Sequence, residues 1–236
     1  MRRDSRDMIS VLPGTVAVYA DLACPWAHVA VQRLWRTRAE LGLDEVVRFD
    51  HRAVLLEVIN RGSLPKPVID AEIPVTAEME PDAGWRLWAE PDWRWPVSRL
   101  LAAEAVQAAK EQGLAASEAL DRALRRAFFA DNACITMRHV VLDVAESSPS
   151  VDAAAVGEAL DAGRARAATI AQVDDFVSGG VITSPHLFTP DGGSWPNPGV
   201  DYQWAGQPGT SPVVLKADDP SVYRRILTRA AEHARE

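Results

Sequence analysis

The strongest constraint on the fold is a strand–helix–strand pattern near the N-terminus, with a cysteine and a proline at its first junction. Thr15–Asp21 is a short run rich in β-branched residues, which predicts a buried strand. Pro25 suits the first turn of a helix, and apolar residues then recur at helical spacing until Gly42. Val46–Asp50 predicts a second strand. Because a helix connects the two strands, they should be parallel, with a right-handed crossover.

The middle of the chain is predicted to be helical. Residues 62–96 contain several prolines and four tryptophans, which either anchor a helical region to the sheet or line a groove. We favour the anchor, because aromatic side chains contribute much of the buried area of a protein. Beyond this segment the spacing of apolar residues and the helix breakers predict helices near Val97–Gln112, Ser117–Ala130, Met137–Ser147, Asp152–Leu160 and Arg164–Val177.

The C-terminal part of the chain is predicted to return to strands. His186–Phe188 has the composition of a strand, and a loop rich in proline and glycine follows over Pro190–Pro198. Asp201–Trp204 is the expected partner of that strand. The last helix is expected over Asp219–Ala231, with an N-cap at Asp218 or Asp219.

Composition excludes several classes of protein. The 236 residues carry a formal net charge of −8, which disfavours a nucleic-acid partner. No apolar run approaches roughly 18 residues, so we expect no membrane span. The two cysteines and five histidines lack the spacing of a disulfide framework or a zinc site, so we expect no metal centre. Met1–Ser10 is basic but contains two aspartates, unlike a secretion signal, and we therefore expect a cytoplasmic protein.

Cys24 stands where the first strand ends and the first helix begins. Unpaired backbone N–H groups and the positive end of the helix dipole favour a thiolate at such a position. We therefore expect the pKa of Cys24 to lie below the value of about 8.5 for a free thiol. The alternative is a small buried apolar side chain, as free cysteines often are.

Cys24-Pro25-Trp26 after a strand, a helical insertion, and Ser184-Pro185 before a late strand together resemble the DsbA-like branch of the thioredoxin superfamily, above all its FrnE-like and predicted dithiol-disulfide isomerase members. The resemblance covers nearly the whole chain. It implies an α/β thioredoxin-like fold with a large α-helical insertion between the βαβ and ββα halves. Residues 11–61 and 178–236 would form the thioredoxin-like domain, and residues 62–177 the helical insertion domain.

The resemblance also implies roles for residues around the cysteine. The Ser184–Pro185 peptide bond would be cis and would face the thiol, and the backbone of Ser184 would pair with a substrate strand. Trp26 is expected to shape an exposed apolar rim. His28 could stabilise the thiolate or bind substrate, although we favour a solvated position on the helix. His186 would meet the groove if strand alternation turns it that way.

Ala27 departs from the family motif, Cys-x-x-Cys, in which the second cysteine releases the substrate. Cys134 is expected to pack structurally, with a role as a resolving or regulatory thiol as the alternative. The sequence therefore predicts a monothiol enzyme, with Cys24, Pro25, Trp26 and Ala27 as its catalytic motif. An outside thiol would resolve the mixed disulfide.

No tightly bound cofactor is expected. The partners would be a low-molecular-weight thiol, such as glutathione or mycothiol, or a protein or peptide disulfide, and the protein would be a monomer or a homodimer. Two other functions stay open. One is a glutathione or mycothiol transferase or isomerase like the kappa-class enzymes, whose relatives usually carry serine at the position of Cys24. The other is a non-catalytic, thioredoxin-like protein that binds peptides.

Overall fold

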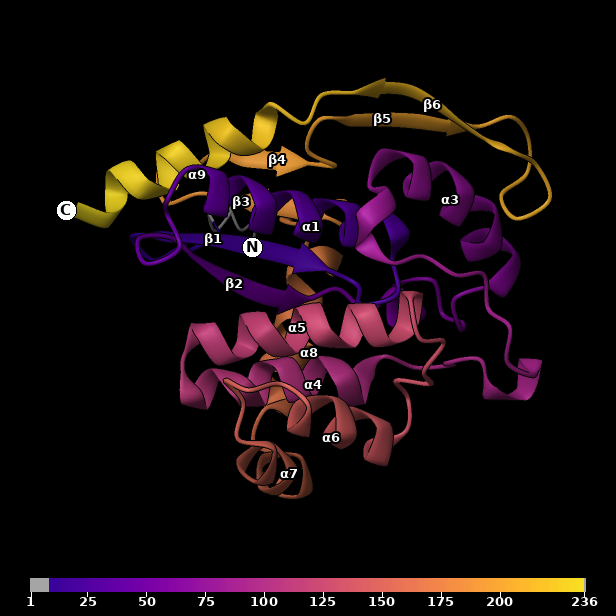
Figure 1. Cartoon of the computed structure of the whole chain (residues 1–236), viewed down its shortest axis with the longest axis horizontal. Helices are drawn as coiled ribbons and strands as arrows, with labels where there is room; N and C mark the ends of the chain where they lie inside the picture. Colours follow the sequence, from indigo (N-terminus) through magenta and orange to yellow (C-terminus); the bar gives the residue numbers. More distant parts are fainter. Residues whose placement is uncertain (1–8, 236) are drawn as a thin grey trace, which may run out of the picture.

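The computed structural model describes residues 9–235 and contains a four-stranded sheet and a two-stranded sheet, with helices packed around them (Figure 1). Most of the basic segment Met1–Ser10 lies outside the described residues. The strand order of the main sheet is β2-β1-β3-β4. Its strands are β1 (Thr15–Ala20), β2 (Arg48–Ala53), β3 (His186–Phe188) and β4 (Ser194–Pro196).

The strand–helix–strand unit forms as predicted. β1 and β2 are parallel, and α1 (Pro25–Glu40) connects them. Alternate residues of β1 face opposite sides of the sheet: Val16 and Val18 join one core with α1 and α9 (Val222–Glu232). Tyr19 belongs to a separate core cluster. The helices α1 and α9 therefore cover one face of the sheet, and helices between residues 100 and 177 lie on the other (Figure 1).

The helices of the insertion lie within a few residues of their predicted bounds. They are α4 (Leu100–Ala109), α5 (Leu114–Phe129), α6 (Arg138–Glu146), α7 (Ala153–Asp161) and α8 (Arg166–Val177), with a 3₁₀ turn at Lys110–Gln112. Most buried apolar side chains of α4 to α7 form a core with residues of the loop after β1, such as Leu22, whereas Val173 of α8 packs in a smaller cluster with Ala53 at the end of β2. The helices α4, α5 and α8 contact β2. The division of the chain at residues 62 and 177 stays a prediction.

Two helices precede this block, and the sequence analysis predicted neither. They are α2 (Leu56–Ile59) and α3 (Lys66–Met79), followed by 3₁₀ turns at Pro81–Ala83 and Asp92–Arg94. Pro67 occupies the first turn of α3, where its missing N–H is not needed, but Pro74 lies inside the helix. The helix forms despite Pro74 because one face packs against α1 and β6 (Val213–Asp218).

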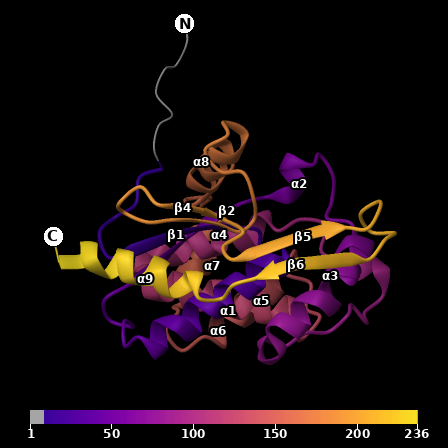
Figure 2. The same ribbon diagram turned by 90° about the horizontal axis from the view of Figure 1, so that it is seen from above.

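The predicted pairing of the late strands is wrong. β3 pairs antiparallel with β4, a three-residue strand within the stretch predicted to be a loop. The expected partner Asp201–Trp204 belongs instead to β5 (Val200–Trp204), which pairs with β6 in a separate antiparallel hairpin. Figure 2 shows this hairpin alongside α3. The sequence did not indicate this pairing, because β4 has only three residues, one of them a proline, and so shows no strand pattern.

The last helix begins later than predicted. α9 has Ser221 at its N-cap, and the carboxylate of Asp219 accepts hydrogen bonds from the backbone and hydroxyl of Ser221. Asp218 is not the cap, because its carboxylate pairs with Arg33 of α1. The adjacent Asp219 and Asp218 therefore have different partners.

Candidate active site

Cys24 caps the start of α1. Its backbone is extended, with φ −81° and ψ 118°, and Pro25 follows in the first turn. The backbone N–H of Cys24 donates to the carbonyl of Asp21 at 3.3 Å, and the carbonyl of Cys24 accepts from the N–H of His28 at 3.0 Å. A short turn therefore carries the chain from the end of β1 directly into the helix, with the cysteine at the junction.

Ser184 lies against this junction although about two-thirds of the chain separates the two segments. The Ser184–Pro185 peptide bond is cis. The thiol of Cys24 donates to the carbonyl oxygen of Ser184 at 3.1 Å, and the backbone N–H of Asp21 donates to the Ser184 hydroxyl at 2.9 Å. β3 places Ser184 there, because it pairs directly with β1. The backbone of Ser184 was expected to pair with a substrate strand, and in this structure its carbonyl accepts from the thiol.

A cavity of about 410 Å³ borders Cys24. Its walls come from the start of α1, from α3, from the segment before β3 and from the β5–β6 hairpin. The lining residues include Trp26, Asn60, Glu72, Thr183, Ser184 and Tyr202. A larger depression of about 660 Å³ lies around Lys66, Asp70 and Trp95 and contains no cysteine. We therefore place the candidate site in the smaller cavity.

The pKa of Cys24 is not lowered, contrary to the prediction. The side chain is 6% exposed, and burial raises its pKa to about 12, with a further contribution from the carboxylate of Glu72. The backbone N–H of Ala27 and the side chain of Ser184 lower the pKa by less. The helix start favours the thiolate as expected, but removal from water outweighs it.

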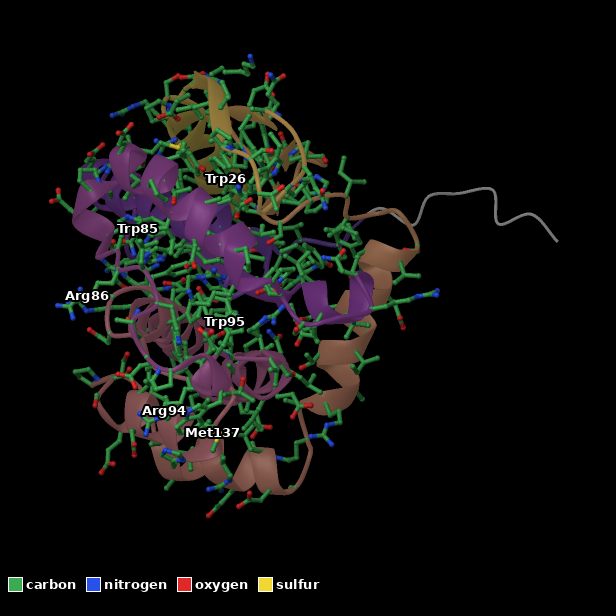
Figure 3. All side chains as sticks on the ribbon, turned by 90° about the vertical axis from the view of Figure 1, so that its right-hand side faces the viewer. Trp26, Trp85, Arg86, Arg94, Trp95 and Met137 are labelled. Carbon is green, nitrogen blue, oxygen red and sulfur yellow. The ribbon has the colours of Figure 1, made fainter. Side chains whose placement is uncertain are left out.

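Trp26 lines the cavity but is not an exposed rim. It is 4% exposed and stacks on Tyr202 of β5, with ring centroids 3.9 Å apart and an angle of 13° between the rings. In Figure 3, Trp26 lies next to the gold C-terminal segment, whereas Trp85 and Trp95 lie lower, toward the insertion. The prediction failed because the hairpin that covers Trp26 was not foreseen.

His28 is neither solvated nor at the sulfur. It is fully buried, stacks on Phe129 and has its Nε2 atom 3.2 Å from the carbonyl oxygen of Ala83. Burial lowers its pKa to about 3. The residues that line the cavity do not include His28, because its ring turns toward the insertion.

His186 lies away from the cavity and bonds to neighbouring segments of the chain. It is buried, and its Nε2 atom lies 2.8 Å from the hydroxyl of Ser194 on β4. Its Nδ1 atom accepts a hydrogen bond from the backbone N–H of Ile182 at 3.3 Å, and burial lowers its pKa to about 4. Strand alternation therefore turns His186 away from the cavity.

The other residues singled out in the sequence differ in burial. Ala27 is fully buried. Cys134 is free and half-buried, and it packs against the core of the insertion, whereas Cys24 belongs to the core of the sheet and α1. Trp85, Trp88 and Trp95 pack on aromatic side chains, while Trp93 is exposed; none of the four tryptophans is among the residues that line the cavity. Trp85 also packs edge-on against His28 of α1, as the predicted anchor would, whereas the ring contacts of Trp88 and Trp95 lie within the insertion.

Asp21, Glu72 and Tyr202 were missed by the sequence analysis. The carboxylate of Asp21 is buried and accepts from the backbone N–H groups of Ala23 and Leu56 and from Arg99 at the N-cap of α4. The position of Asp21 three residues before Cys24 was a usable signal. Glu72 and Tyr202 had none, because they reach the cavity from elements that were not predicted or were paired wrongly.

No protein-family model and no curated protein matches the sequence. Solved structures do match. A probable DsbA oxidoreductase from Streptomyces coelicolor superposes with a TM-score of 0.64 at 17% identity, over 92% of this chain and 89% of that one. The cytosolic disulfide reductase DsbM from Pseudomonas aeruginosa superposes with a TM-score of 0.61 at 15% identity, over 91% of this chain and 97% of that one.

The fold is that of the DsbA-like thioredoxin proteins. A 2-hydroxychromene-2-carboxylate isomerase shares it, with a TM-score of 0.57 at 17% identity over 77% of this chain and 88% of that one. The predicted thioredoxin-like fold with a helical insertion is therefore confirmed. Across residues 9–235, no helix has the length and apolar character needed to cross a membrane.

Proposed function

We propose that the protein is a DsbA-like thiol–disulfide oxidoreductase in which Cys24 is the single nucleophile. The observation that carries the proposal is the position of its Sγ atom, which bonds to the carbonyl of Ser184 and borders the cavity. Cys24 is the only cysteine among the residues that line this cavity, and the buried Ala27 provides no second sulfur. The Cys24-Pro25-Trp26 motif is the ground for extending the proposal to the FrnE-like branch.

The reaction would proceed by thiol–disulfide exchange. Cys24 first loses its proton to solvent or buffer, and its thiolate then attacks one sulfur of a disulfide. A new S–S bond forms, the old one breaks, and the second half of the substrate leaves as a thiolate that takes up a proton. An external thiol then loses its proton and attacks the substrate sulfur of the mixed disulfide. A disulfide forms between these two sulfurs, and Cys24 leaves as a thiolate that takes up a proton. The structure of DsbM with GSH supports a small thiol as that second substrate.

Mass spectrometry of the intact protein after incubation with a small symmetric disulfide tests the proposal. We expect one adduct on the wild type and on Cys134→Ala, none on folded Cys24→Ala, and release only after an external thiol is added. Failure of the folded wild type to form an adduct at Cys24 would overturn the assignment. Release without external thiol that depends on Cys134 would instead make Cys134 the resolving thiol.

One observation favours a second candidate, a thiol transferase or isomerase. The protonated thiol of Cys24 donates to Ser184, as a serine hydroxyl at the same position could, and the isomerase fold matches. In that function the site would activate a bound external thiol. We expect Cys24→Ser to abolish turnover if Cys24 is the nucleophile. Retained transfer to an electrophilic substrate would establish the second candidate instead.

A further inference from the structure

Glu72 is a buried carboxylate in the wall of the cavity beside Cys24. It is 6% exposed and lies on α3. Among residues 9–235, the structure gives Glu72 no ion pair, although other buried carboxylates, such as Glu104 and Glu118, have arginine partners. Burying a carboxylate without a counter-ion is costly, and such a group recovers stability when a cation reaches it.

The rest of the cavity wall provides no positive charge. The polar side chains that accompany Glu72 there are neutral, among them Asn60, Thr183 and Tyr202. The nearby guanidinium of Arg99 is 1% exposed, bonds to Asp21 and Glu57, and is not among the lining residues. A ligand carboxylate in the cavity would therefore meet a negative charge and no compensating cation.

We propose that Glu72 selects the small thiol or disulfide by charge, so that the cavity favours a substrate with an ammonium group near its sulfur and disfavours one with carboxylates. The inference rests on the proposed reactivity of Cys24. Cationic disulfides should react with Cys24 faster than neutral ones, and neutral ones faster than anionic ones. Glutathione, with two carboxylates and one ammonium group, would be a poorer substrate than a neutral or cationic thiol of similar size.

Three disulfides with the same two-carbon arm between sulfur and end group test this ranking. Cystamine ends in ammonium groups, bis(2-hydroxyethyl) disulfide in hydroxyls, and 3,3′-dithiodipropionate in carboxylates. The rate of adduct formation at Cys24 is measured by mass spectrometry for each and divided by the rate of the same disulfide with 2-mercaptoethanol. Burial raises the pKa of Glu72 to about 7, so the measurement is made at about pH 8, where its carboxylate is ionised.

We expect the normalised rate with cystamine to exceed that with 3,3′-dithiodipropionate at least about tenfold. Glu72→Gln should bring the two rates within about twofold of each other, because it removes the charge and keeps the shape. Glu78→Gln is the matched control, since Glu78 is an exposed carboxylate on the same helix, and it should preserve the ranking. The neutral disulfide separates charge selection from any change in the ionisation of Cys24.

The outcomes separate this inference from the proposed function. If none of the three disulfides modifies Cys24 in the folded protein, the proposed function fails. If adducts form but the dicarboxylate reacts as fast as cystamine, or Glu72→Gln leaves the ranking unchanged, charge selection is wrong while the function stands. Thermal unfolding shows whether Glu72→Gln folds; if it does not, the ranking in the wild type decides alone.

Discussion

Cys24 combines two environments that act on its proton in opposite directions. The start of α1 offers backbone N–H groups, while burial and the carboxylate of Glu72 favour the neutral thiol. The thiol of Cys24 donates a hydrogen bond to the carbonyl of Ser184, so the resting site holds a protonated thiol rather than a thiolate. A reaction at Cys24 therefore needs a deprotonation step that an exposed thiolate would not need.

The first prediction concerns this step. The rate of alkylation of Cys24 by neutral iodoacetamide should still be rising above about pH 8.5, the midpoint of a free thiol, because the pKa of Cys24 is raised. Glu72→Gln should move the midpoint to lower pH by removing the second cause of the shift, and Glu78→Gln should not. A midpoint at or below that of free cysteine in the wild type would contradict this account.

The connection between β1 and α1 is the element that brings sheet and insertion together. Asp21 directly follows β1. Its carboxylate accepts from the N–H group of Leu56 at the start of α2 and pairs with Arg99 at the N-cap of α4. A second arginine, Arg125 of α5, donates to the carbonyl of Asp21 at 2.9 Å. The loop that holds Cys24 is therefore fixed by buried charges from two insertion helices.

Asp21→Ala should destabilise the protein by about 3–5 kcal/mol, because it leaves the guanidinium of Arg99 buried with only part of its partners. Asp161→Ala is the matched control: Asp161 also pairs with an arginine, Arg138, but both side chains are largely exposed, and the cost should stay below about 1 kcal/mol. Urea unfolding followed by circular dichroism measures both. Equal costs for the two variants would show that the buried pair does not hold the loop.

Sequence reasoning succeeded where the pattern is local. The helix over Leu114–Phe129 and the strand over Thr15–Ala20 carry their own periodicity, and Pro25 marks the start of α1. Sequence reasoning did not find α3, because Pro74 interrupts its helical pattern and the helix depends on packing against other elements. The cavity wall was therefore predicted on one side only: Cys24 and Ser184 were foreseen, whereas Glu72 and its effect on the thiol depend on long-range packing.

At the scale of the whole molecule, buried histidines set the response to acid. Burial lowers the pKa of His28 to about 3 and those of His51 and His186 to about 4. In the unfolded chain a histidine has a pKa near 6.5. Below about that pH, the unfolded state therefore binds protons that the folded state does not bind. Glu72 acts in the opposite direction, because burial raises its pKa to about 7 and the folded state then holds a proton that the unfolded state releases.

Burial also raises the pKa of Glu118, but the three histidines outnumber these two carboxylates, so the free energy of unfolding should fall as the pH drops from about 6.5 toward about 4. His28→Gln should reduce that slope by about one proton, or about 1.4 kcal/mol per pH unit, whatever its effect at neutral pH. Chemical unfolding at a series of pH values measures the slope. A slope that is the same for the wild type and His28→Gln would mean that His28 is not the buried neutral group described above.

The contact between Cys24 and Ser184 spans 160 positions of the chain, and that between Asp21 and Ser184 spans 163. On a ribosome that adds about 5–20 residues per second, the thiol therefore leaves the exit tunnel roughly 10–30 seconds before its acceptor does. The insertion can assemble during that interval, because its helices contact one another locally. A nascent chain that stops before residue 184 would thus present the cysteine as an ordinary reactive thiol, and its protection would begin only when about four-fifths of the polypeptide has been made.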